Sequence, residues 1–285
     1  MSTGARVVKT WAPLVPFAAW MFVFLGIPTI AVCIGAFQKE SGGFTMSNVN
    51  QATSGVYLVG FENSLKLGII EAIVPAIAGT FIAYAIHTSR GSLLRRSLVT
   101  LSGVFANFGG VPLAFLFIAA IGGETALVSN WLRDIGIDLY AHNITIYTFG
   151  GVALVYMYFQ IPLMVLVILP AFEGLKNSWH EAAEGLGARS WEYWRYVGVP
   201  VLMPSILGSA LLLFGSSLSA YATAEALTAG SIALTPIQIG SFLNGNVLAG
   251  QENIGKALAL GLVVIIAVTM TLYVVLQRRA SRWLR

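Results

Sequence analysis

The stretch Glu181–Pro204 reads E-A-A-E-G-L-G-A-R-S-W-E-Y-W-R-Y-V-G-V-P-V-L-M-P and separates two long apolar runs. Its first four residues favour a helix. Gly185 and Gly187 can end that helix, with Gly187 in a backbone conformation that a Cβ would oppose. Ser190 can cap a second short helix. The aromatic residues of this second helix predict either anchors for a partner protein or an interfacial belt on a membrane surface: Trp191, Tyr193, Trp194 and Tyr196.

The composition is that of a membrane protein. Hydrophobic residues make up 57% and charged residues 10% of the 285 positions, whereas soluble domains carry about 25% charged residues. The one cysteine, Cys33, lies inside an apolar run, which excludes a disulfide framework and a cysteine metal cluster. The net charge is +4, but the basic residues are unevenly spread, which indicates membrane topology rather than nucleic-acid binding.

Runs of about 20 apolar residues with few or no charges mark six candidate spans. We predict one all-α, multi-pass membrane domain over residues 1–285, with a polar loop at 173–201 between the fourth and fifth spans. The predicted spans are residues 12–37, 67–88, 97–122, 144–171, 202–223 and 257–277.

The distribution of lysine and arginine predicts the orientation. An even number of spans, six, places both termini on the same side of the membrane, and the loop at 173–201 lies on that side too. Of the 16 lysine and arginine residues, 12 fall on this side and 4 on the other. This bias puts the termini and the loop in the cytoplasm.

The segments on the opposite side differ in composition. Residues 39–63 are rich in Gly, Ser, Thr and Asn and predict an exposed loop. Residues 124–143 predict a short surface helix with Trp131 at the interface. Residues 225–253 are punctuated by Gly and Pro and partly apolar, so we expect them to dip back into the protein.

The fifth span is rich in small residues. Ser209 and Ser216 are seven positions apart and share a helical face, and Ser219 and Tyr221 continue beyond them. Small residues allow close helix packing in a membrane, and a serine stripe can alternatively line a polar path. Both interpretations remain open, since they can hold on opposite faces.

Two carboxylates lie in or near the spans. Glu71 is predicted about one turn into the second span, near the outer face, and Glu225 at the outer end of the fifth. An ionisable group in a span is a functional hypothesis: here, attraction of a cationic solute in an outward-facing vestibule. The alternative is that each reaches the interface or bonds a neighbouring helix.

The motifs of several enzyme classes are absent. The sequence contains neither G-x-x-x-x-G-K-[ST] nor G-x-S-x-G, and His180-Glu181-x-x-Glu184 has Glu where a zinc protease needs its second His. We therefore expect no catalytic residue and no metal site, and an energy source supplied by a partner.

The loop carries a family signature, E-A-A-x3-G-x9-I-x-L-P, from which this chain departs conservatively, with Val in place of Ile and of Leu. The chain resembles the permease subunits of type I (MetI-like), binding-protein-dependent ABC importers. In that family the loop forms coupling helices that dock on a cytoplasmic ATPase. The residues that match are Glu181, Ala182, Ala183, Gly187, Val197, Val199 and Pro200.

The resemblance implies a set of partners. These are a cytoplasmic ATPase dimer that binds ATP and Mg, a second permease subunit, and an extracytoplasmic solute-binding protein, all at the bacterial inner membrane. The chain itself would bind no cofactor. Within the family it resembles the branch that carries polyamines such as spermidine and putrescine, with relatives for phosphonate, thiamine and ferric iron.

Two other classes stay open on the residues alone. An ion-coupled secondary transporter would show paired acidic and basic residues at mid-depth in the spans, and the sequence shows none. A channel or scaffold protein would have no need of the Glu181 motif.

Overall fold

The computed structural model describes residues 14–39, 41–89, 91–136, 145–245 and 251–283. Within these ranges, five helices are long and apolar enough to cross a membrane, and a bent helix pair supplies a sixth span when it is counted as one. The described residues form no β-strand beyond one isolated bridge between Gln38 and Phe44. The all-α, multi-pass prediction is therefore confirmed.

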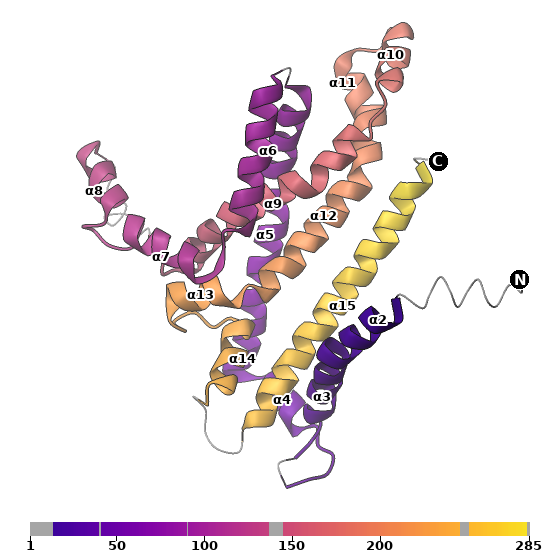
Figure 1. Cartoon of the computed structure of the whole chain (residues 1–285). Coiled ribbons are helices and arrows are strands. Elements are labelled where there is room, and N and C mark those ends of the chain that lie inside the picture. The colour runs from indigo at the N-terminus through magenta and orange to yellow at the C-terminus, as the bar shows by residue number, and fades with distance from the viewer. Residues whose placement is uncertain (1–13, 40, 90, 137–144, 246–250, 284–285) are drawn as a thin grey trace, which may run out of the picture. The chain divides into compact units, whose positions relative to one another are not determined.

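The helices are labelled in Figure 1. The first half of the chain forms α2 (Leu14–Met21), the π-helical η1 (Phe22–Gly26), α3 (Ile27–Gly35), α4 (Ser47–Ala52), α5 (Gly55–Thr88), α6 (Ser92–Asn107), α7 (Gly110–Ile121) and α8 (Leu127–Asp134). The second half forms α9 (Phe149–Glu173), α10 (Asn177–Gly185), α11 (Ser190–Tyr193), the π-helical η2 (Trp194–Gly198), α12 (Val199–Ser219), α13 (Tyr221–Thr228), α14 (Thr235–Leu243) and α15 (Glu252–Trp283).

The chain divides into two compact units, Met1–Leu58 with Gln238–Val263, and Val59–Ile237 with Val264–Arg285. In the first unit, amide side chains converge on one carbonyl group: Asn48 Nδ2 and Asn253 Nδ2 each lie 2.9 Å from the carbonyl oxygen of Gln38. In the most apolar part of the run Leu14–Gly35, none of the residues is fully buried by the described part of the chain. Such a helix suits contact with lipid or with another subunit.

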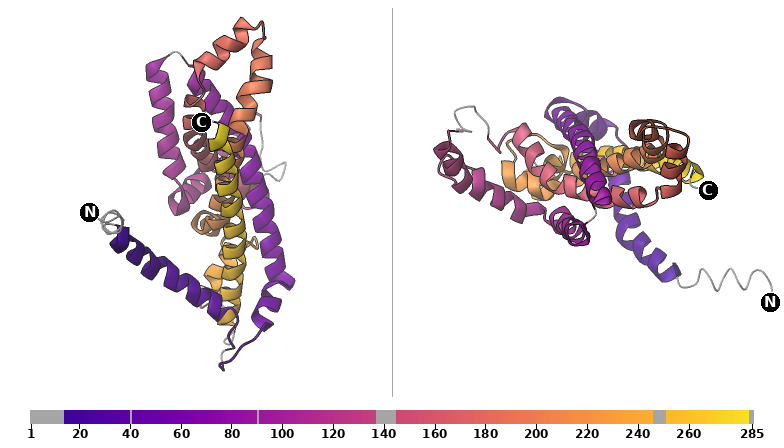
Figure 2. Two further views of the ribbon diagram at one scale, coloured as in Figure 1. Left: turned by 90° about the vertical axis from the view of Figure 1, so that its right-hand side faces the viewer. Right: turned by 90° about the horizontal axis from the view of Figure 1, so that it is seen from above.

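The second unit is built on α5, α9 and α12. Helix α9 packs against both α6 and α12 (Figure 1, Figure 2). Two glycines let α5 approach its neighbours: a Cβ at Gly68 would lie 2.8 Å from the ring of Phe214 on α12, and one at Gly79 only 2.6 Å from Cβ of Met164 on α9. Close helix approach through small residues is the usual way that membrane helices associate.

The predicted third span is broken. Helices α6 and α7 are bent by 100° with respect to each other, so residues 97–122 are not one straight helix. Gly110 has φ +75°, a conformation that glycine adopts at no steric cost. Its N–H donates to Thr223 Oγ1 at 2.9 Å, and α7 packs along α13. The bend is thus held by α13, a contact that no local pattern predicts.

Two helices have other bounds than the spans predicted for them. Helix α5 begins at Gly55, twelve residues before the predicted start of the second span, so Glu71 lies near the middle of this helix and not one turn from its start. Helix α12 ends at Ser219, because Ala220 leaves the helical region at φ −79° and ψ +72°. Tyr221 therefore begins a separate helix, α13, and does not extend the fifth span.

The predicted surface helix is present as α8, with Trp131 62% exposed; residues 137–143 of the same segment lie outside the described residues. The segment at 225–253 forms the rest of α13 and the helix α14, again with residues 246–250 outside the described part.

Candidate functional site

The first half of the signature forms a complete helix C-terminus. At the end of α10 the N–H of Gly187 donates to the carbonyl of Glu184 at 2.9 Å, and that of Ala188 to the carbonyl of Ala183 at 3.0 Å. These two bonds define a Schellman motif, which needs a left-handed residue at the position of Gly187. Gly187 has φ +77°, which confirms the conformation predicted for it. Glu181 and Ala182 are exposed on the same helix.

The second half of the signature enters the membrane-spanning helix without a break. Ser190 is the first residue of α11 and not its cap, so the predicted capping role is wrong; instead the Glu192 carboxylate accepts the N–H of Arg189 at 2.6 Å. Helix α11 continues through η2 into α12, as one run from Ser190 to Ser219. Pro200 has no N–H to donate, and its ring crowds the carbonyl group four residues earlier. The π-helical turn η2 lies just before this proline, as a single-turn interruption of the α-helical hydrogen bonding.

The aromatic residues of this segment divide into two groups. Tyr193 is buried and Trp194 is half-buried. The Trp194 ring packs edge-on against Tyr84 of α5, with ring centroids 5.1 Å apart, and Tyr193 packs against His180 of α10 at 4.8 Å. These two residues therefore brace the loop on the membrane-spanning helices and on α10, and only the other two are placed to meet a partner.

The outward pair flanks a cation. Trp191 and Tyr196 are 52% and 68% exposed, and the Arg195 guanidinium lies 5.7 Å from each ring centroid. Cation–π contact at this distance orients the arginine beside the two rings. The result is an exposed surface of aromatic and basic character next to the signature.

A groove of about 370 Å³ joins the two halves of the signature. Leu186 at its edge is 88% exposed, whereas Val199 and Pro200 are exposed outside the groove. An exposed apolar groove bounded by polar residues is typical of a protein-binding surface. Its lining residues are Trp179, Ala182, Ala183, Leu186, Val197 and Val201.

The predicted serine stripe is not uniformly exposed. Ser209 is 3% exposed and its hydroxyl donates to the carbonyl of Ser205 at 2.8 Å. Ser216 is half-buried, and only Ser219 is exposed, with its hydroxyl bonded to the carbonyl of Ser216. Within this chain the stripe therefore runs from the protein interior to the surface, and its role in a path stays a prediction.

The two predicted carboxylates differ sharply in environment. Glu71 is 0% exposed, so it lies in no open vestibule of this chain. Glu225 is half-buried, and its Oε2 has no hydrogen-bond partner in the described part of the chain. Tyr221, also half-buried, packs with the core of the second unit.

Sequence reasoning missed Gln160, which is fully buried on α9 and whose Nε2 donates to the carbonyl of Leu213 on α12 at 2.9 Å. The available signal was its position as a single amide side chain inside the apolar run of the fourth span.

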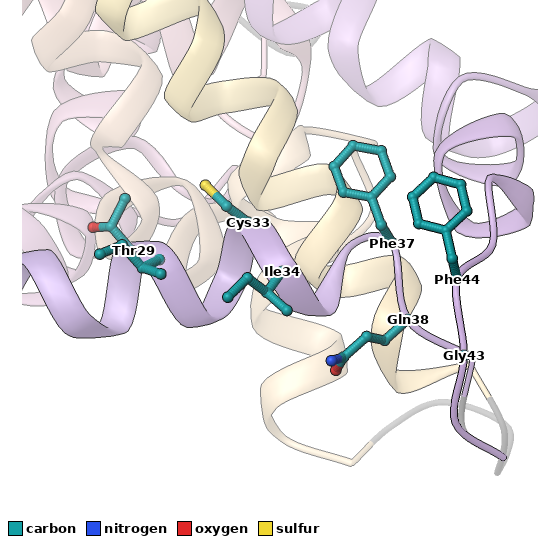
Figure 3. A pocket seen from close by; sticks show the side chains of 8 residues that line it. Thr29, Cys33, Ile34, Phe37, Gln38, Gly43 and Phe44 are labelled. Atoms are coloured by element: carbon teal, nitrogen blue, oxygen red, sulfur yellow. The ribbon is translucent and has the colours of Figure 1, made fainter.

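A larger hollow lies in the first unit. Figure 3 shows Thr29, Cys33 and Ile34 along α3, with Phe37 and Phe44 beyond them. These two rings are stacked with centroids 5.9 Å apart. The hollow of about 520 Å³ is lined mainly by apolar side chains and contains none of the predicted site residues, as expected of a surface that meets lipid.

The geometry defines a class: a multi-pass α-helical membrane protein whose signature residues form an exposed helical segment that runs into a membrane-spanning helix. Residues 76–285 match the family model described as "Binding-protein-dependent transport system inner membrane component". The chain belongs to this family, and it is the inner membrane permease subunit of an ABC importer.

The similar proteins carry different solutes. The chain is 24% identical over 262 residues to the spermidine/putrescine transport system permease protein PotB of Haemophilus influenzae, covering 90% of this chain and 89% of that protein. It is 24% identical to the sulfate transport system permease protein CysW of Synechocystis sp., covering 92% and 90%. It is 25% identical to the trehalose transport system permease protein SugB of Mycobacterium tuberculosis, covering 97% and 95%.

The fold also matches solved structures. A chain in the crystal structure of a bacterial alginate ABC transporter, in complex with an alginate-bound periplasmic protein, superposes with a TM-score of 0.74 at 18% identity, covering 99% of this chain and 96% of that chain. At this identity the match bears on the fold alone.

Proposed function

We propose that the segment from α10 to η2 docks on a cytoplasmic ATPase and transmits its motion to the membrane-spanning helices. The observation that carries the proposal is the combination of the capped helix α10 with the groove beside it. The groove exposes apolar side chains, while Trp194 ties the segment to α5. Movement of a partner seated there would therefore reach the span directly, through the continuous helix Ser190–Ser219.

The partners follow from this role. The ATPase, as a dimer, would bind ATP and Mg, and this chain would hold no cofactor. A second permease subunit would complete the path, and a solute-binding protein would deliver the solute on the opposite face. The proposed topology has both termini and α10 in the cytoplasm, supported by the 12-to-4 bias of basic residues.

A matched pair of substitutions tests docking. Leu186→Asp places a charge at the edge of the groove, whereas Leu127→Asp places one on α8, where the leucine is 80% exposed against 88% for Leu186. We expect Leu186→Asp to weaken ATPase binding at least tenfold, because burying an unpaired charge in an interface is costly. Leu127→Asp should bind as the wild type does. Equal binding by both variants would refute the docking assignment.

For the solute, we propose a polyamine or another small organic cation. Support comes from the similarity to a spermidine/putrescine permease and from the half-buried carboxylate Glu225. Helix α12 carries no lysine or arginine that would favour an anion. The alternative is a different polar solute, such as phosphonate, thiamine or ferric iron. An ion-coupled secondary transporter is a much weaker alternative, because transport in this family is driven by a partner subunit.

Glu225→Gln tests the cation proposal. We expect the substitution to slow spermidine uptake by the reconstituted transporter several-fold at low ionic strength and less at high ionic strength, where salt already screens the carboxylate. Uptake unchanged at low salt would remove Glu225 from the path. A binding screen on the solute-binding protein would identify the solute independently.

A further inference from the structure

Three helices of the second unit meet in a tightly packed layer. Gly68 of α5 faces Phe214 of α12, and Gly79 of α5 faces Met164 of α9, each with no room for a side chain. Gln160 of α9 bonds the backbone of α12 at Leu213. The layer thus contains the central turns of α5, α9 and α12.

Glu71 lies inside this layer. It is three residues after Gly68 and eight before Gly79, so it shares their face of α5. The residue is 0% exposed, and neither carboxyl oxygen has a hydrogen-bond partner among the described residues. A buried polar group without a partner calls for an explanation, such as a functional role or a bound water or ion.

The charged and titratable groups around the layer do not neutralise a carboxylate. Helix α9 contributes Tyr156, which interacts electrostatically with Glu71 and whose hydroxyl donates to the carbonyl of Ala220. Helix α12 carries no charged residue. Helix α13 packs in the core of the same unit and adds a second acid, Glu225, and the phenol of Tyr221, but no cation. On α5 itself, Lys66 is exposed and paired with Glu62 at 2.7 Å.

An ionised carboxylate in such a place is strongly disfavoured, and a buried acid instead takes up a proton. The layer holds other polar atoms that lack a partner in the described part of the chain. Gln160 Oε1 and Ser217 Oγ are buried and without a hydrogen-bond partner within the described ranges. The first is an acceptor only, and a protonated carboxyl group supplies one O–H donor to the layer.

We propose that Glu71 is a proton-binding site: it holds a proton while α5, α9 and α12 are packed together, and it releases that proton when the helices separate and water reaches the carboxyl group. The packed state then binds one proton more than the separated state. Raising the pH therefore favours separation, with a change in the ratio of the two states of up to about tenfold per pH unit. This goes beyond the proposed function and does not depend on which solute is carried.

Two readouts on the full transporter in lipid nanodiscs test the proposal. Nitroxide labels at the exposed positions Thr88 and Met203 report the separation of α5 from α12 as a function of pH. We expect the wild type to shift by up to about tenfold per pH unit, and Glu71→Gln, which carries no titratable group, to lose this shift. Glu62→Gln, an exposed substitution on the same helix, should keep it.

Infrared spectroscopy provides the second readout. The C=O stretch of a protonated carboxyl group should be present in the wild type near neutral pH and absent in Glu71→Gln. In Glu71→Asp the band should be displaced. The aspartate variant therefore still identifies the band if the glutamine variant does not assemble. A pH response that survives in Glu71→Gln overturns the proposal. So does a spectrum without a Glu71-dependent band, which would instead indicate an ionised site that binds a cation.

Discussion

Replacement of Gly187 tests the docking segment most directly. Its φ of +77° lies in the left-handed region, which costs other residues about 1–2 kcal/mol. No atom of the described residues lies within 4 Å of a Cβ built at this position. The penalty of Gly187→Val therefore comes from the backbone conformation and not from a clash of its Cβ, and it acts on the turn that ends α10.

This penalty has a measurable size. A cost of about 1–2 kcal/mol lowers the equilibrium constant between the native turn and its alternatives by a factor of about 5–30. If the native turn is the form that docks, the apparent Kd for the ATPase rises by up to the same factor. Titration of the permease complex in nanodiscs with its labelled ATPase measures this Kd, and uptake by proteoliposomes measures the coupling that depends on it.

Two variants serve as controls. Gly185→Ala changes a glycine at a helical position of α10 that also has open space around it, and alanine favours a helix over glycine by about 1 kcal/mol. Its Kd should not rise. Gly187→Asn should weaken binding less than Gly187→Val, because asparagine tolerates the left-handed region. Wild-type binding and uptake by Gly187→Val, or equal damage from Gly185→Ala, would refute the reasoning.

Three further predictions concern packing and orientation. Gly79→Ala should lower the stability of the complex by about 1–3 kcal/mol, because the added methyl group overpacks the contact of α5 with α9. Gly103→Ala should not lower it, since a Cβ at Gly103 has no neighbouring atom within 4 Å in the described part. Thermal unfolding of the two variants tests this difference. Gln160→Leu should cost about 1 kcal/mol through its lost bond to α12, so an unchanged unfolding temperature would contradict that role. With the topology proposed, a membrane-impermeant thiol reagent added to intact cells should leave Ser190→Cys unlabelled, and labelling from outside would reverse the orientation.

The sequence predicted features that depend on local chemistry. Apolar runs identified the spans because length and hydropathy suffice for a membrane helix, and the left-handed conformation of Gly187 followed from the turn that the signature requires. It also placed Trp131 correctly on a short surface helix.

The errors arose where distant segments decide the structure. The break at Ala220 has no local cause in its sequence. The bend after Asn107 depends on Thr223, whose hydroxyl oxygen accepts a hydrogen bond from the Gly110 amide, 113 residues earlier in the chain. Glu71 was placed near a helix end because the polar residues before Lys66 suggested a loop, yet they continue α5. Its burial depends on α9 and α12, which lie far away in the chain.

The hydrogen bond from Asn253 to Gln38 has a consequence for biosynthesis. The two residues are 215 positions apart in the sequence. At about 5–20 residues per second, Asn253 is therefore translated about 10–40 s after Gln38. During that interval the end of the apolar helix Leu14–Gly35 has the bond from Asn48 to Gln38 but not yet the one from Asn253. Until Asn253 has been synthesised, the end of the helix Leu14–Gly35 lacks this bond, so substitutions at Asn253 should be seen first as increased degradation of the newly made chain.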